Sequence, residues 1–129
     1  AKDKIFDLNA SYAKVFGCNK VPSVDQTKFV FVNDNDSIEI ANFTIKVLYT
    51  PGHTDDSVCY IIDNFFFSGD TLFKNSVGRT DLITGNTFKL GQSLVKIKNL
   101  KQDYIIYPGH DGTTSLSSEK KNNPYLKNN

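Results

Sequence analysis

The tripeptide Pro-Gly-His occurs twice in this chain, each time at the end of an apolar run. The first copy, residues 51–53, follows a run that ends at Thr50, and the second, residues 108–110, follows a run that ends at Tyr107. Glycine permits the sharp turn that ends a buried strand, and binding sites in layered α/β proteins form in the loops at strand ends. We therefore expect an α/β fold in which His53 and His110, the two histidines of the sequence, emerge from strand ends.

A carboxylate follows a third apolar run in the same way. Asp70 comes directly after residues 65–69, which read Phe-Phe-Phe-Ser-Gly. Two imidazoles and a carboxylate suit zinc or iron(II), and the three residues are too far apart in the sequence to form a local metal-binding finger. They can meet only through folding. The alternatives without a metal are an ordinary turn with an exposed histidine at His53 or His110, and a helix cap at Asp70.

Apolar periodicity predicts where the strands and helices lie. Strands are expected over residues 28–32, 37–40, 43–50, 58–62, 65–67 and 104–107, with a turn over 33–36. Helices are expected over residues 2–16, 87–100 and 115–122, with a loop over 17–27. In the second helix, the expected buried face consists of Phe88, Leu94, Val95 and Ile97. Ser115 is expected to cap the third helix.

The composition fits one globular domain. Charged residues make up 22% of the sequence and the net charge is +1, so no basic surface favours nucleic acid or an anionic membrane. No apolar run reaches the roughly 20 residues of a membrane span. The two cysteines, Cys18 and Cys59, are too few for a disulfide framework, so we expect a cytoplasmic protein with reduced thiols. Cys59 lies in an alternating strand and is expected to be a core residue and not a nucleophile.

Five segments in order resemble one known family. They are Thr-Pro-Gly-His-Thr at 50–54, Phe-Ser-Gly-Asp-Thr-Leu-Phe at 67–73, Val-Gly-Arg-Thr-Asp at 77–81, Tyr-Pro-Gly-His at 107–110, and the ending at 119–126. Together they resemble the metallo-β-lactamase superfamily, and most closely its glyoxalase II-like (hydroxyacylglutathione hydrolase-like) branch. The resemblance implies an αβ/βα sandwich, of which residues 1–129 would be a single partial domain. This C-terminal half would consist of one mixed β-sheet with flanking helices.

The resemblance also implies a role for each matching residue. His53 would bind the first of two divalent metals, Asp70 would bridge them, and His110 would bind the second. The metals expected in the parent enzyme are zinc ions, with iron or manganese as alternatives. The implied reaction is hydrolysis of a thioester such as S-2-hydroxyacylglutathione.

Three further residues are candidates for supporting roles. Arg79 and Lys120 are expected to contact an anionic substrate, and Asp111 is expected to orient His110. The alternative for Arg79 is an ion pair with Asp81 that anchors the loop.

The signature His-x-His-x-Asp-His of this family is absent, because no histidine precedes His53. Three of the seven expected ligand positions remain, so no complete catalytic site is expected in this chain. Each metal would keep one imidazole and the shared carboxylate, and we expect little or no bound metal and no activity in this chain alone. We also expect an exposed sheet face, to be covered by the missing N-terminal half or by a second copy. Methionine is absent, and we expect Ala1 to be a processing or cloning boundary.

Two other functions remain open from the sequence. A mononuclear-iron enzyme like the persulfide dioxygenases shares the Gly-Arg-Thr-Asp of residues 78–81 and would use His53 and Asp70 in a facial triad. A half-domain without catalysis would act as a binding module.

Overall fold

Alternating apolar residues form four successive antiparallel strands. The computed structural model describes residues 29–127, and its first strands are β1 (Ser37–Ile40), β2 (Phe43–Tyr49), β3 (Val58–Ile62) and β4 (Phe65–Gly69). Two-residue turns join β1 to β2 and β3 to β4. Ala41 and Asp63 begin these turns, both at a φ of 52°, the positive value that tight hairpin turns require.

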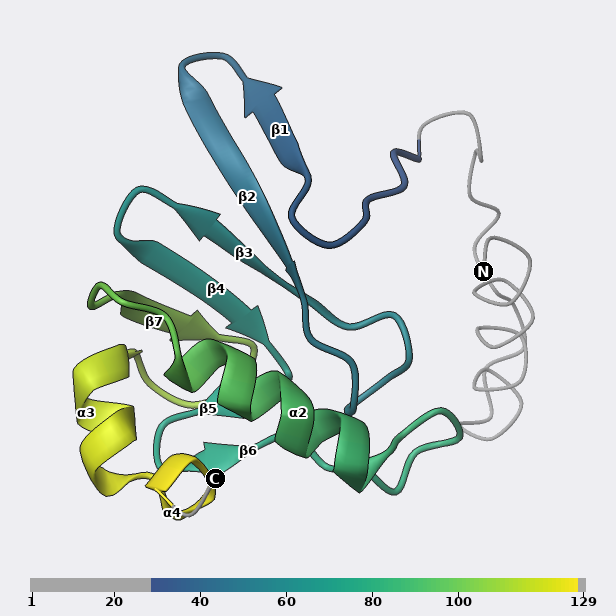
Figure 1. The fold of residues 1–129 in the computed structure, drawn as a ribbon, viewed down its shortest axis with the longest axis vertical. Helices are drawn as coiled ribbons and strands as arrows, with labels where there is room; N and C mark the ends of the chain where they lie inside the picture. Colours follow the sequence, from purple (N-terminus) through teal and green to yellow (C-terminus); the bar gives the residue numbers. More distant parts are fainter. Residues whose placement is uncertain (1–28, 128–129) are drawn as a thin grey trace. The chain divides into compact units, whose positions relative to one another are not determined.

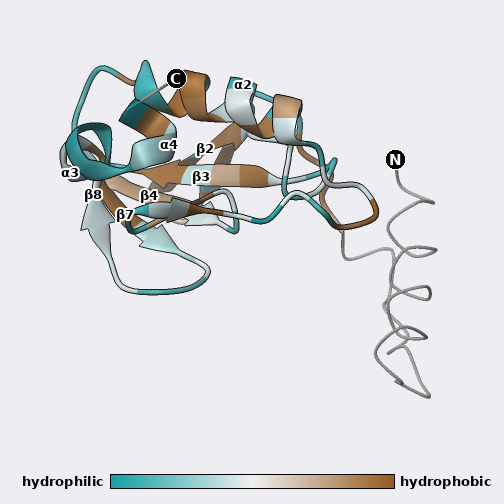
Figure 2. Cartoon of the chain, turned by 90° about the horizontal axis from the view of Figure 1, so that it is seen from below, coloured by the Kyte–Doolittle hydropathy of each residue, from teal (hydrophilic) through white to brown (hydrophobic). Residues whose placement is uncertain are grey.

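A parallel strand pair brings two of the predicted ligands to the same edge of the sheet. After β4 and a short hairpin, the chain forms helix α2 (Thr87–Lys98) and returns as β7 (Ile105–Pro108), parallel to β4. The six-stranded sheet has the order β1-β2-β3-β4-β7-β8, where β8 is Thr114–Ser115. Figure 1 shows β1 to β4 and β7 side by side, and Figure 2 labels β8. Because parallel strands end at the same edge, Asp70 after β4 and His110 after β7 emerge side by side.

Helices cover one face of this sheet and enclose the core. Leu90, Leu94 and Ile97 lie on the buried face of α2 and are at most 4% exposed. They belong to one apolar cluster with alternate residues of the strands: Leu48, Cys59, Ile61, Phe66 and Ile106. Two short helices, α3 (Leu116–Asn122) and α4 (Pro124–Lys127), add Leu116 and Leu126 to the same core. Figure 2 shows α2 and α4 above the strands.

The other sheet face carries apolar and aromatic side chains that no described helix covers. Phe67 and Tyr107 stack there with ring centroids 5.5 Å apart, and Phe65 contacts the same tyrosine at 5.9 Å. Phe67, Ile105 and Tyr107 are each about 40% exposed. A shallow apolar hollow of about 440 Å³ lies on this face, lined by Ile38, Ile45, Tyr60, Ile62 and Phe67. The exposed sheet face expected from the sequence is therefore present in residues 29–127.

Most of the predicted elements are confirmed, with particular corrections. The turn over 33–36 and the two hairpins of β1–β2 and β3–β4 are present, as are α2, β7 and α3 near the predicted positions. Ser115 caps α3, as predicted, by accepting a hydrogen bond from the Ser118 N–H. The predicted strand over 28–32 is wrong for residues 29–32, which form no regular element. The predictions over 2–16 and 17–27 lie outside the described residues. The chain divides into two units, residues 1–31 and 32–129, and all named elements belong to the second.

The predicted face of α2 is also partly wrong. Phe88 is 74% exposed and Val95 is 40% exposed, whereas Leu90 and Ser93 are buried. Leu90, Leu94 and Ile97 lie on the side of the helix that faces the sheet. With the helix rotated in this way, Phe88 lies on the opposite, solvent-facing side. Four short elements were not predicted: β5 (Leu72–Phe73) and β6 (Ser76–Val77), which form a hairpin, strand β8, and helix α4. Within the described part of the chain, no helix is long and apolar enough to cross a bilayer.

Candidate metal centre

The end of β4 directs Asp70 out of the sheet. The pairing of β4 with β7 shifts register between Phe67 and Gly69, and Gly69 takes a φ of 51°. Strand β4 ends at this irregularity, and the side chain of Asp70 is left 33% exposed. No helix follows, since the next element is strand β5. The alternative that Asp70 caps a helix is therefore wrong.

Helix α2 braces the loop that carries His53. The backbone carbonyl of Gly52 accepts a hydrogen bond from the Asn86 N–H at 2.8 Å, and the Pro51 carbonyl accepts one from the Ser93 hydroxyl at 2.7 Å. Gly52 has a φ of 144°, and a Cβ there would lie 2.4 Å from the backbone N and Cα of Leu90. Glycine is thus required both by conformation and by the close approach of the helix.

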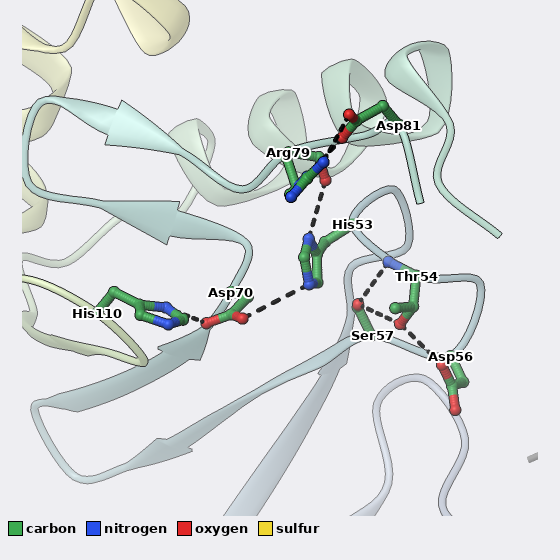
Figure 3. A network of polar contacts seen from close by, with 8 residues as sticks. All are labelled: His53, Thr54, Asp56, Ser57, Asp70, Arg79, Asp81 and His110. Carbon is green, nitrogen blue, oxygen red and sulfur yellow. Dashed lines mark hydrogen bonds and ion pairs between the residues drawn. The ribbon is translucent and has the colours of Figure 1, made fainter. Parts of the chain in front are cut away.

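The imidazole of His53 is held in a defined orientation. Its Nδ1 lies 2.9 Å from the backbone carbonyl oxygen of Arg79. A carbonyl can only accept, so Nδ1 carries the hydrogen and the neutral ring leaves its lone pair on Nε2. That Nε2 faces Oδ2 of Asp70 at 3.5 Å, and the side chain is only 17% exposed (Figure 3).

The imidazole of His110 approaches Asp70 from the other side. Its Nδ1 lies 2.9 Å from Oδ1 of Asp70, and its side chain is 67% exposed. The ring stands edge-on to Phe73, with centroids 5.5 Å apart and planes at 80°. Gly109 makes this approach possible, because a Cβ there would lie 2.3 Å from Oδ1 of Asp70. The structure therefore brings together the three residues singled out from the sequence.

The spacing of these groups fits half of a metal pair. Two zinc ligands at 2.0–2.2 Å in tetrahedral geometry are about 3.3 Å apart, close to the 3.5 Å between His53 Nε2 and Asp70 Oδ2. His110 uses the other carboxylate oxygen, so no single point is flanked by all three side chains. Accordingly, residues 29–127 contain no group of three His, Cys, Asp or Glu side chains that could hold one metal ion.

The comparison with known families agrees with this geometry. The family model of the metallo-beta-lactamase superfamily matches residues 4–110, a span that includes all three side chains. The chain belongs to the metallo-beta-lactamase superfamily. The mixed sheet with flanking helices is the fold of its solved relatives over the part that they share.

Three relatives illustrate the position of the chain in the superfamily. Hydroxyacylglutathione hydrolase GloC of Haemophilus influenzae is 31% identical, over 97% of this chain and 60% of its own length. ETHE1 of Myxococcus xanthus is 34% identical with a TM-score of 0.72, over 89% of this chain and 54% of its own. TTHA1623, solved in a di-iron-bound form, is 29% identical with a TM-score of 0.68, over 90% and 57%. The 129-residue chain itself spans about half the length of the curated relatives that it matches.

The three side chains singled out from the sequence border an open hollow of about 410 Å³. Its lining includes His53, Asp70 and His110, with Phe73, Ser76, Val77, Gly78, Arg79 and Asp111 around them. The guanidinium of Arg79 donates to both carboxylate oxygens of Asp81 at 2.6 and 2.7 Å, which is the ion pair weighed from the sequence. That hydrogen-bonded pair holds the pKa of Asp81 at about 2.

The other two supporting candidates have different surroundings. Lys120 lies on α3, and its ammonium donates to the Leu100 carbonyl oxygen at 2.8 Å. The hollow therefore contains Arg79 and not Lys120. Asp111 lines the hollow with a φ of 66°, while the carboxylate that contacts His110 is that of Asp70.

A buried polar group connects the loops that carry His53 and Asp70. Thr50, Cys59 and Thr71 are at most 1% exposed, and Thr50 Oγ1 lies 3.2 Å from the Cys59 sulfur and 3.3 Å from Thr71 Oγ1. Burial raises the pKa of the Cys59 thiol to about 11. The thiol is therefore protonated at neutral pH, and the expectation that Cys59 is a core residue is confirmed.

Sequence reasoning missed Phe73 as part of this site. Phe73 lies in β5, a strand of two residues, and its ring contacts His110. A strand this short has no periodicity that a sequence can reveal. The available signal was its place in the segment at 67–73, three residues after Asp70.

Proposed function

We propose that this chain supplies one wall of a binuclear-metal hydrolase site that cleaves a thioester such as S-2-hydroxyacylglutathione. The observation that carries the proposal is the position of Asp70 between two imidazoles, each facing a different carboxylate oxygen. Hydrolase names among the relatives, and a relative solved with two iron ions, support the same reading. We propose zinc as the metal, with iron or manganese as alternatives.

Each of the three side chains would have its own role in holding the metals. His53 would hold one metal through Nε2, His110 would hold the other, and Asp70 would bind both. When bound, such a metal pair lowers the pKa of a water molecule to near neutrality and polarises the substrate carbonyl. The Arg79 carbonyl fixes the His53 ring by accepting the Nδ1 hydrogen, and the loop stays in place because Ser93 and Asn86 of the α2 region bind its backbone.

Arg79 is our candidate for binding the anionic end of the substrate. Its side chain lines the hollow next to the imidazoles and is 65% exposed. A guanidinium binds carboxylates with two parallel hydrogen bonds, as it does here with Asp81. We expect Arg79→Lys to raise KM for an anionic thioester while kcat changes less, because lysine keeps the charge and loses the bidentate geometry.

The chain alone is expected to be inactive. Zinc sites that catalyse reactions hold the metal with three protein ligands, and His53, Asp70 and His110 give only two to each metal. The test is metal analysis and thioester hydrolysis for the 129-residue chain and for a longer protein that adds His-x-His-x-Asp-His upstream. We expect activity in the longer protein only, and loss of that activity in its Asp70→Asn variant. Enzyme-like rates in the 129-residue chain would contradict the proposal.

A second candidate is an iron enzyme like the persulfide dioxygenases. The likeness to ETHE1 and the Gly-Arg-Thr-Asp of residues 78–81 favour it. One iron would then be held by a facial triad that includes His53 and Asp70, and His110 would bind no metal. Metal content separates the candidates, since the hydrolase requires two metals per active protein and the alternative requires one iron.

We also propose that the exposed sheet face is covered in the working protein. The preferred occupant is the other half of the parent domain, and in its absence a second copy of this chain, since apolar faces of this kind mark interfaces. Light scattering on the 129-residue chain tests the second case. We expect Phe67→Lys to reduce association. Phe88→Lys should leave it unchanged, because Phe88 is also a phenylalanine but lies on the solvent-facing side of α2 and not on the exposed sheet face. If the unsubstituted 129-residue chain stays monomeric at high concentration, self-association is contradicted.

A further inference from the structure

A buried carboxylate lies in α3, outside the residues assigned to the metal centre. Glu119 is 0% exposed, and a buried carboxylate is costly unless hydrogen bonds satisfy its oxygens. Its Oε1 accepts from the Thr114 hydroxyl at 2.6 Å. Its Oε2 accepts from the Asn75 backbone N–H and from the Asn123 side-chain amide, both at 2.8 Å. No lysine or arginine of the described residues forms a salt bridge with it.

The amide of Asn123 extends this cluster to the β5–β6 turn. Asn123 is also 0% exposed, and its Nδ2 donates to the backbone carbonyls of Ser76 at 3.0 Å and Phe73 at 3.3 Å. Glu119 and Asn123 thus bind three backbone groups of residues 73–76. Asn75 has a φ of 59°, in the left-handed region that asparagine adopts more readily than most residues.

This turn forms the wall of the hollow beside His110. Phe73 stands edge-on to the His110 ring, and Phe73 and Ser76 both line the hollow. Thr114, the third partner of Glu119, follows the loop of residues 109–113 that carries His110. One carboxylate therefore holds the segments on both sides of the same imidazole.

We propose that Glu119 is a positioning residue for His110. Glu119 holds the Phe73 turn on one side of the imidazole, and it holds strand β8, which follows the His110 loop, on the other side. The inference rests on the proposed role of His110 as a metal ligand. The claim that Glu119 sets the position of the His110 ring concerns the metal-free protein and can be tested separately from metal binding. It also explains the segment at 119–126 that resembles the family: Glu119 and Asn123, one helical turn apart, form one clamp.

The hydrogen bonds, and not the negative charge, are the essential feature. A glutamine at position 119 can keep every bond, since its carbonyl oxygen can accept from Asn75 and Asn123 while its amide donates to the Thr114 hydroxyl. A leucine leaves the partly buried Asn75 N–H and Thr114 hydroxyl without their acceptor, which can prevent folding. Thr114→Val is the milder probe, because it removes only the bond on the His110 side.

The experiment uses NMR of the imidazole signals in the metal-free 129-residue chain, which has two histidines. We expect Thr114→Val to shift or broaden the signals of His110 and to leave those of His53 unchanged, since His53 is held by Arg79. Glu119→Gln should resemble the parent chain. Asp103→Asn is the matched control, because Asp103 binds Ser117 at the start of α3 and does not contact the Phe73 turn.

Zinc titration of the longer protein that adds His-x-His-x-Asp-His upstream gives a second measurement, because the 129-residue chain alone is expected to bind little or no metal. We expect Thr114→Val to weaken the zinc-dependent change at His110 by about tenfold, the usual effect of losing a group that orients a ligand. The proposal is overturned if Thr114→Val leaves the His110 signals unchanged, if it moves both histidines equally, or if Glu119→Gln is as damaging as Glu119→Leu. If His110 moves as expected but the longer protein cleaves no thioester, the proposed function alone fails.

Discussion

The side-chain hydroxyls of Thr50 and Thr71 lie 3.3 Å apart in the buried interior, although 21 residues separate them in the chain. Thr71 follows Asp70 directly, and Thr50 precedes the loop that carries His53 by one residue. The hydroxyl pair therefore links the loops that carry His53 and Asp70 from inside the protein, on the side away from solvent. Its bonds matter for stability because a buried hydroxyl without a partner is costly.

We expect Thr71→Val to destabilise the chain by about 1 kcal/mol, because valine leaves the Thr50 hydroxyl with one partner fewer. Thr71→Ser keeps the hydroxyl and should retain most of the stability. Urea unfolding curves of the three proteins provide the measurement. Equal stability of the valine variant and the parent would show that the pair contributes nothing.

The Cys59 thiol should be unreactive in the folded chain. Burial raises its pKa to about 11, so the thiolate that attacks alkylating reagents is scarce at neutral pH. We expect iodoacetamide to leave Cys59 unmodified until urea unfolds the protein. Peptide mass mapping distinguishes Cys59 from Cys18, which lies outside the described residues. Rapid labelling of Cys59 in the native chain would contradict the buried position.

The strands and the loops that carry His53 and His110 could be predicted because their signals are local. Alternation fixes which strand residues face the core, and Pro-Gly before each histidine marks the strand end. The Glu119 clamp could not be predicted, because a glutamate in a polar helix usually faces solvent. Its burial depends on Asn75, 44 residues away in the sequence.

The face of α2 shows a second limit. Phe88 was expected on the buried face because of its spacing from Leu94, Val95 and Ile97, but all the contacts of the helix together decide which face is buried. Leu90, Leu94 and Ile97 fit the stripe that meets the sheet, and Phe88 falls outside it. A single apolar residue therefore does not determine which side of a helix is buried.

The pair of Arg79 and Asp81 should be visible in a pH titration. The side-chain hydrogen bond from Arg79 lowers the pKa of Asp81 from 3.8 to about 2. Because the folded pKa is the lower one, the stabilising effect is present above about pH 4 and is lost as the pH falls towards 2. Both side chains are about two-thirds exposed, so the effect on stability is small.

Carboxyl NMR signals can follow this titration directly. In Arg79→Gln we expect the midpoint of Asp81 to rise towards its ordinary value. Asp103 is the internal control, since its pKa is lowered by hydrogen bonds from Ser117 and should not respond to that substitution. An unchanged midpoint at Asp81 would mean that the ion pair does not form in solution.

Two glycines of the His110 loop should differ sharply in their tolerance of a methyl group. A Cβ at Gly109 would lie 2.3 Å from Oδ1 of Asp70, whereas a Cβ at Gly112 would meet nothing within 4 Å. We expect Gly109→Ala to displace the Asp70 carboxylate, to break its hydrogen bond with His110 and to weaken zinc binding by at least about tenfold. Gly112→Ala should leave both unchanged. Imidazole NMR signals of the 129-residue chain measure the displacement, and zinc titration of the longer protein that adds His-x-His-x-Asp-His upstream measures the binding. Equal behaviour of the two variants would show that the Gly109 approach does not shape the site.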